Sequence, residues 1–159
     1  MKSALDEIKT RARVRLNTAR REGMAGESKL ADTLNAAARE LGFLHFDHAR
    51  RVLEGQALPG EDWGDFWHAP RTGILLNHWF ARHDEAVAVL AHERSGYLLP
   101  YRRQCFIAQD HFVRELGVDP TAPEWVVLGR DLVTGYATPA WQALAAQRAR
   151  APMSSFAVR

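Results

Sequence analysis

The sequence predicts a mostly helical α+β protein, in which an N-terminal three-helix unit is followed by a small α+β unit with a short sheet. Apolar residues recur at helical spacing through the first 55 residues, and glycines interrupt the pattern three times. Pro59 and Gly60 then open a segment rich in tryptophan and phenylalanine. Short apolar runs typical of strands occur only beyond that segment. We therefore expect residues 1–55 to be entirely helical and most of the β structure to lie within 73–108.

Composition and charge exclude several classes of protein. The chain has 159 residues, 47% of them hydrophobic, and a net charge of +2, which is typical of a globular protein with a packed core. Its single cysteine, Cys105, allows no internal disulfide, and this favours a reducing compartment.

The N-terminal residues MKSALDEIKTRARVR lack the apolar region of a signal peptide. No stretch has the roughly 18 apolar residues of a membrane span. We expect a cytoplasmic protein with no membrane partner.

Residues 4–21 are expected to form the first helix. An apolar stripe at 3.6-residue spacing runs along it, formed by Leu5, Ile8, Ala12, Leu16 and Ala19. Basic side chains flank this stripe on both sides, and no acid occurs between residues 8 and 21. Residues 1–56 hold 11 basic and 8 acidic side chains, a net charge of +3, whereas the rest of the chain carries −1. The positive charge of the protein therefore belongs to its helical unit.

Two shorter helices are expected to complete the N-terminal unit, residues 1–55. Ser28 is a suitable N-cap for the first of them, and Gly42 stands where a left-handed C-cap residue would end it. The second spans about 45–54 before Gly55 stops it, and its inner face is formed by Phe46, Ala49 and Leu53. A unit of this size is small to stand alone, so we expect it to pack on the rest of the chain or on a partner.

Residues 56–72 are expected to connect the two units without being a free linker. A free linker is polar, but this connector carries Trp63, Phe66 and Trp67 within five residues. Aromatic side chains at that density must pack against something. We expect Trp67 to be buried within the chain and Trp63 to be the more exposed, and we consider Trp63 and Phe66 candidates for a protein-interaction site.

Two strands are expected in the second unit, which spans residues 73–150. The first is GILLNHWF, residues 73–80. The second is YLLPYRRQCFIA, residues 97–108, which is typical of a strand broken at Pro100. Because proline cannot donate a hydrogen bond to a neighbouring strand, this segment belongs at a sheet edge or a bend.

Between these strands, residues 84–94 are expected to form a helix. Asp84 is its candidate N-cap, and Val87 and Leu90 would face inward. Gly96 would end it. The spacing thus predicts a helix packed on the small sheet.

Two more helices are expected after the second strand, at about 109–116 and 138–149, the latter with Pro139 in its first turn. Residues 124–133 fit a helical turn and a strand equally well. The tail, 151–159, is expected to be loosely held. The second unit is therefore expected to be α+β with few strands.

The basic face of the first helix is a candidate nucleic-acid interface. Lys9, Arg13 and Arg20 lie along one shoulder of the apolar stripe, whereas Arg11 and Arg15 lie along the other. A row of cations of this kind can follow a phosphate backbone. Arginines beside an apolar stripe also extend over its edges simply to reach water, so a solvated face is the alternative.

The helices on either side of Gly42 also suggest a helix-turn-helix motif. In that motif the second helix would need apolar residues at the positions of His48 and Arg51. We therefore favour a plain helical hairpin over a DNA-reading helix.

No known catalytic motif is present. The only candidates for an enzymatic site are Tyr101, Arg103 and His111, which belong to or follow the densest polar cluster near a strand. An edge strand protected by charge explains the same cluster without catalysis, and we favour that interpretation. The seven histidines and one cysteine form no metal-ligand pattern. We expect neither a metal nor another cofactor.

Three segments carry a resemblance to a known domain: the basic helix LDEIKTRARVRL, the helix LADTLNAAARELGF, and a short helix with an aromatic residue, here Phe46. Together they span Leu5 to Leu53, about a third of the chain. This segment resembles a small helical domain, sometimes labelled glyoxalase-related, at the N-terminus of many plasmid- and phage-associated bacterial proteins. The chain departs from it in having His45 and Phe46 where that domain often carries a charged residue and then tryptophan. The resemblance implies a link to mobile elements, and no glyoxalase chemistry, because no metal-ligand set is present.

A second resemblance covers NHWFARHDEAVAVLAHERSGYLLPYRRQCFIA, which is similar to part of an uncharacterised proteobacterial family and implies no activity. The function we favour is that of a non-catalytic bacterial accessory or regulatory protein that binds a protein partner. The alternative is nucleic-acid binding through the basic N-terminal helices. The third is a small enzyme centred on Tyr101, Arg103 and His111. The oligomeric state is left open.

Overall fold

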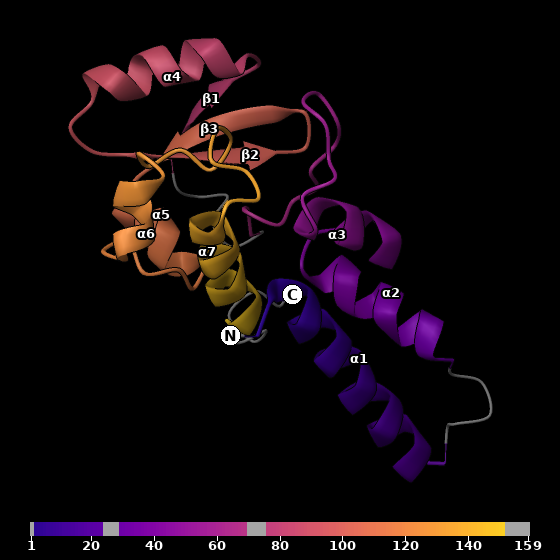
Figure 1. Ribbon diagram of the computed structural model, residues 1–159. Helices are drawn as coiled ribbons and strands as arrows, with labels where there is room; N and C mark the ends of the chain where they lie inside the picture. Colours follow the sequence, from indigo (N-terminus) through magenta and orange to yellow (C-terminus); the bar gives the residue numbers. More distant parts are fainter. Residues whose placement is uncertain (1, 24–28, 70–75, 152–159) are drawn as a thin grey trace.

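The computed structural model describes residues 2–23, 29–69 and 76–151. Within these ranges it contains seven helices and one three-stranded antiparallel sheet (Figure 1). The chain therefore has the mostly helical α+β fold that its sequence predicts. Three expectations concern residues outside these ranges: the N-cap Ser28, residues 73–75 of the strand expected at 73–80, and the tail beyond Ala151. Within its described part that strand is shorter than expected, because only His78–Phe80 pairs in the sheet. No helix in the described ranges is both long and apolar enough to cross a membrane.

Helix α1 spans Ala4–Arg21, the range expected from its apolar stripe. Ser3 begins it with a capping box, in which its hydroxyl accepts from the Asp6 backbone N–H at 3.1 Å and the Asp6 carboxylate accepts in return at 3.2 Å. The buried positions of α1 are Ala4, Leu5, Ile8, Ala12 and Leu16. The periodicity of the sequence thus identified the inner face of this helix.

Helices α2 (Leu30–Glu40) and α3 (Phe46–Leu53) follow α1. Figure 1 shows α1 and α2 side by side, extending away from the sheet. Gly42 ends α2 as expected, with φ +93° and with backbone bonds from Gly42 to Arg39 and from Phe43 to Ala38. A Cβ at Gly42 would lie 2.6 Å from the carbonyl carbon of Asp65. The same glycine therefore ends the helix and lets the connector approach it.

The sheet consists of β1 (His78–Phe80), β2 (Tyr97–Tyr101) and β3 (Gln104–Ala108), in the order β1-β3-β2. The expectation of one strand broken at Pro100 is wrong, because 97–108 is a hairpin whose turn is Arg102–Arg103. Pro100 lies inside β2, paired with Cys105. Its strand is at an edge of the sheet, where a proline is tolerated.

The hairpin turn is held by the connector. Arg102 has φ +50°, an unfavourable value for a residue with a side chain. Its backbone N–H donates to the Gly64 carbonyl at 2.9 Å, and its carbonyl accepts from the Trp63 N–H at 3.1 Å. Its guanidinium pairs with Asp65 at 2.8 Å. These contacts explain how a turn without glycine or asparagine is stable here.

Helix α4 spans His83–His92 and covers the sheet (Figure 1). It begins one residue earlier than expected, and Asp84 lies in its first turn, paired with Arg82, instead of capping it. Leu90 is buried as expected, but Val87 is 37% exposed and Ala86 takes the inner position. The helix is thus rotated slightly from the orientation that its larger apolar residues suggest.

The remaining helices are α5 (Asp110–Glu115), α6 (Pro123–Val127) and α7 (Pro139–Arg150). The ambiguous stretch 124–133 is helical at its start and forms no strand. It begins within α6 and then forms a parallel bridge between Asp131 and Leu98 at the outer edge of β2.

One hydrophobic cluster joins the helical unit, the connector, the hairpin and α7. Trp63, Phe66 and Trp67 are 8%, 0% and 2% exposed, so all three aromatics of the connector belong to this core. Trp67 packs edge-on against Trp141 of α7 with ring centroids 5.7 Å apart. The guanidinium of Arg148, also on α7, donates to the Phe66 carbonyl at 2.8 Å. The connector and α7 therefore bind the two parts of the chain together.

Candidate functional site

The two basic shoulders of α1 have different environments. Arg11 donates to the carbonyls of Ala149 and Ala151 at the end of α7, at 2.5 and 3.0 Å. Burial lowers the pKa of Arg11, and nearby Glu7 opposes part of that effect. Arg15 pairs with Glu40 of α2. The shoulder formed by Arg11 and Arg15 thus holds α1 against its two neighbouring helices.

The opposite shoulder, formed by Lys9, Arg13 and Arg20, faces outward. Arg13 and Arg20 are exposed and Lys9 is half-buried. No acidic side chain in the described part of the chain lies within ion-pair distance of any of the three. The structure thus brings together the three residues proposed from the sequence as one accessible row of cations, which we call the exposed basic shoulder.

Two residues of the rejected helix-turn-helix motif have structural roles. The imidazole of His48 accepts from the Leu44 backbone N–H at 3.0 Å and contacts the Asp62 carbonyl at 2.7 Å. Arg51 forms a two-pronged ion pair with Glu61 of the connector. Both side chains therefore attach α3 to the connector.

Tyr101, Arg103 and His111 do not line one site. Tyr101 ends β2 and packs against His68 and Trp79, with ring centroids 5.2 Å apart in both pairs. Arg103 lies in the hairpin turn and donates to the Gly60 carbonyl at 2.6 Å. His111 is exposed on α5. The cavity that Arg103 lines includes neither Tyr101 nor His111 among its walls.

The protein-interaction candidates Trp63 and Phe66 lie in the core. Trp63 packs against Tyr136 with ring centroids 4.3 Å apart, and Phe66 stacks on Phe43 at 5.2 Å. Trp63 is the more exposed of the two tryptophans of the connector, as expected, but at 8% it offers little surface. Neither side chain forms part of an exposed apolar patch in this structure.

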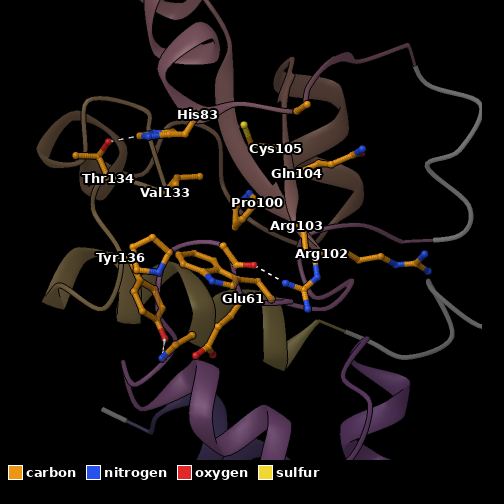
Figure 2. A pocket seen from close by; sticks show the side chains of 15 residues that line it. Glu61, His83, Pro100, Arg102, Arg103, Gln104, Cys105, Val133, Thr134 and Tyr136 are labelled. Atoms are coloured by element: carbon orange, nitrogen blue, oxygen red, sulfur yellow. Dashed lines mark hydrogen bonds between the residues drawn. The ribbon is translucent and has the colours of Figure 1, made fainter.

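A cavity of about 630 Å³ lies between the connector, the start of α4, the hairpin and the loop at 133–136 (Figure 2). Tyr136 lies on one side of it and His83 and Cys105 on the other. Trp63, whose ring packs on that of Tyr136, also lines the cavity, and Arg103 lies on its hairpin side. This is the size of a small-molecule site.

A hydrogen-bonded group holds one end of the cavity. The Asp131 carboxylate accepts from the backbone N–H groups of Val133 and Thr134 at 2.9 and 3.0 Å and from the Thr134 hydroxyl at 2.6 Å. Its Oδ2 also lies 3.3 Å from His83 Nε2. A carboxylate oxygen of this kind can only accept, so Nε2 carries the proton and Nδ1 of a neutral ring is an acceptor. Asp131 therefore fixes the tautomer and orientation of His83.

Cys105 lines the cavity but is not activated for catalysis. Its side chain is buried, with Sγ 3.9 Å from the Phe80 carbonyl. Burial, with a smaller effect from Asp131, raises the pKa of the thiol to about 11. A protonated thiol is a weak nucleophile. The arrangement around His83 therefore suits binding of a ligand better than covalent chemistry.

Sequence reasoning missed this cavity and the hydrogen-bonded group of His83, Thr134 and Asp131 at one end of it. The local pattern Asp131-Leu-Val-Thr134 is typical of a turn closed by its own side chains. No signal in the sequence links that turn to His83, which lies 48 positions earlier. Among the residues that the structure describes, no three His, Cys, Asp or Glu side chains are grouped so as to hold a metal ion.

Comparisons of this chain with models of known protein families, with curated proteins and with solved structures found no match. The resemblance of Leu5–Leu53 to a helical domain of plasmid- and phage-associated proteins therefore stays a prediction.

Proposed function

We propose that the protein binds a nucleic-acid backbone through the exposed basic shoulder of α1. The observation that supports this is the contrast between the two shoulders of the helix. Arg11 and Arg15 are engaged by α7 and α2, whereas the exposed basic shoulder has no ion-pair partner among the described residues. Cations presented in this way displace the counterions of a phosphate backbone on binding, which is the main source of non-specific affinity.

The spacing of the shoulder suits one strand of a nucleic acid. From Lys9 to Arg20 the helix rises about 16 Å at 1.5 Å per residue. That length corresponds to about five nucleotides at 3.4 Å per nucleotide along one strand. Lysine and arginine contacts to phosphates carry no sequence information. We therefore expect binding that depends on salt and little on sequence.

A protein partner seated on Trp63 and Phe66, the function favoured by the sequence, has less support. Trp63 and Phe66 are 8% and 0% exposed, so the connector would have to leave the core before a partner could reach them. Burying large aromatic side chains contributes several kcal/mol, roughly 1.5–3 kcal/mol each. Exposing them would therefore cost a large part of the stability of an ordinary domain. The resemblance of Leu5–Leu53 to a domain of mobile-element proteins is in keeping with a nucleic-acid ligand.

The proposal is tested by fluorescence anisotropy with a labelled DNA duplex of about two helical turns and with a single-stranded RNA. The triple substitution Lys9→Gln, Arg13→Gln and Arg20→Gln keeps the aliphatic cover of α1 and removes three charges. We expect it to weaken binding at low salt by at least about tenfold.

The control removes the same charge from exposed arginines elsewhere, with Arg50, Arg94 and Arg114 each changed to Gln. Binding by this control should stay within about twofold of the unmodified protein. If the two triple variants lose affinity equally, net charge and not the exposed basic shoulder is responsible. If the unmodified protein binds neither DNA nor RNA at low salt, the proposal is wrong.

A further inference from the structure

The cavity beside the hairpin has no role in the nucleic-acid proposal, because none of its walls belongs to α1. Its volume of about 630 Å³ falls within the range of roughly 300–1,000 Å³ that small-molecule sites occupy. It also lies where the connector meets the second part of the chain, a common location for such sites. The chemistry of its walls indicates which ligand would fit.

One wall is aromatic and rigid. The rings of Trp63 and Tyr136 pack against each other with centroids 4.3 Å apart and planes tilted by 40°. The Tyr136 hydroxyl donates to the Val52 carbonyl and accepts from the Ala57 N–H, so this ring is held at its far end. Pro100 and Val133 extend the apolar lining. A planar apolar body packs well on a surface of this kind.

The hairpin side of the cavity carries a cation, Arg103, that forms no ion pair among the described residues, although Glu61 lies near enough to interact with it electrostatically. Glu61 and Arg102 line the cavity, but each pairs with a residue outside it, Arg51 and Asp65 respectively. Arg103 donates one N–H to the Gly60 carbonyl, and no carboxylate in the described ranges lies within ion-pair distance of it. Its remaining N–H groups are available to an anion, which a planar guanidinium binds in a two-pronged manner.

The opposite end of the cavity offers hydrogen-bonding groups to a ligand. In Figure 2, His83 and Cys105 lie on the side of the cavity away from Glu61 and Tyr136. His83 is hydrogen-bonded to Thr134. The Asp131 carboxylate holds the His83 ring at Nε2, so the position of that ring does not depend on a ligand. This end can orient a polar group of a ligand.

We propose that this cavity binds a small organic anion with a flat, apolar body. The anionic group lies against Arg103 on the hairpin side, and the body packs on the wall of Trp63 and Tyr136. Such a ligand matches the cavity in size and charge, whereas a neutral or cationic ligand would form no ion pair with Arg103. The inference is independent of nucleic-acid binding, since it uses other residues and another part of the surface.

A pair of fluorescent probes tests the proposal on the full chain. Anilinonaphthalene sulfonate has a flat apolar body and one negative charge, and phenylnaphthylamine has nearly the same body without the charge. We expect the sulfonate to bind at least about tenfold more tightly than the amine. Arg103→Gln should remove that preference and leave amine binding within about twofold. Arg94→Gln, an exposed arginine outside the cavity, should change neither.

A substitution inside the cavity gives a second measurement. Val133→Phe, which fills the cavity, should abolish binding of both probes, and near-ultraviolet circular dichroism shows whether this variant is still folded. If this variant is not folded, the Arg103→Gln result decides.

Two results would overturn the proposal. One is no sulfonate binding at concentrations up to about 1 mM. The other is equal binding of the two probes to the unmodified protein. Neither of these outcomes bears on the exposed basic shoulder of α1.

Discussion

Arg11 and Arg13 stand two positions apart on α1 and have opposite environments. Arg11 donates to two carbonyls at the end of α7, and its burial lowers its pKa. Arg13 is exposed and has no ion-pair partner among the described residues. The sequence places them on different shoulders of one helix, but it does not say which shoulder another helix covers. Packing therefore decides which of two similar residues is available to a ligand.

His68 of the connector should make the protein less stable in acid. Burial among aromatic rings lowers the pKa of His68 below its ordinary 6.5, and Asp65 offsets this only in part. The unfolded chain therefore binds the proton more readily than the folded protein does. The free energy of unfolding should then fall as the pH drops below about 6.5. His68→Phe keeps a ring among Trp79, Tyr101 and Phe112 and removes the titrating group.

Urea unfolding at about pH 7.5 and about pH 5 measures this effect. The loss of stability between the two values should be smaller in His68→Phe than in the unmodified protein. His111→Gln, at an exposed position, is the control and should leave the loss unchanged. Equal losses in all three proteins would show that His68 does not contribute.

At the scale of elements, most helices could be predicted from the sequence, whereas the pattern of α6 is ambiguous and the hairpin could not be predicted. The bounds of α1 follow from local signals, an apolar stripe with a cap at its start. Pro139 likewise marks the first turn of α7. The hairpin turn has no such signal, because Arg102–Arg103 contains neither glycine nor asparagine. It depends on backbone bonds from Trp63 and Gly64, nearly forty positions earlier.

Gly42 should tolerate substitution less well than Gly23, although both end helices at positive φ. A Cβ at Gly23 has nothing within 4 Å, so Gly23→Ala should cost only the left-handed conformation, about 1–2 kcal/mol. A Cβ at Gly42 would lie 2.6 Å from the Asp65 backbone. Moving that backbone should add about 1–3 kcal/mol.

Chemical denaturation of the two alanine variants measures the difference directly. Because both share the same type of helix end, the difference isolates the close approach of the connector to α2. Equal destabilisation of the two variants would mean that the connector is free to move away from Gly42.

At the scale of the whole molecule, one core joins segments that are far apart in the sequence. Trp67, Trp141 and Ile8 belong to the same hydrophobic cluster. The cavity likewise combines the connector, α4, the hairpin and the loop at 133–136. Local patterns cannot reveal such a site, because each contributing residue is unremarkable in its own segment. The row formed by Lys9, Arg13 and Arg20 could be predicted because it lies on one helix, but its exposure depends on packing and could not.

The N-terminal helices and the rest of the chain should unfold together. Ile8 of α1 is fully buried, and Ile8→Ala should destabilise the protein by about 2–5 kcal/mol. All five tryptophans lie beyond residue 55. The unfolding transition seen by tryptophan fluorescence should therefore shift as far as the one seen by circular dichroism. A fluorescence transition that does not move would show that the two parts unfold independently.

The salt dependence of nucleic-acid affinity tests the central claim most directly. Each phosphate neutralised by a cation contributes about 0.9 to the slope of log K against log salt on duplex DNA. Removing Lys9, Arg13 and Arg20 together should therefore lower the slope by about 2.7. Arg15 lies on the same helix, but its charge is already paired with Glu40. Arg15→Gln should therefore leave the slope nearly unchanged. Equal slopes for the unmodified protein and the triple variant would contradict binding through the exposed basic shoulder.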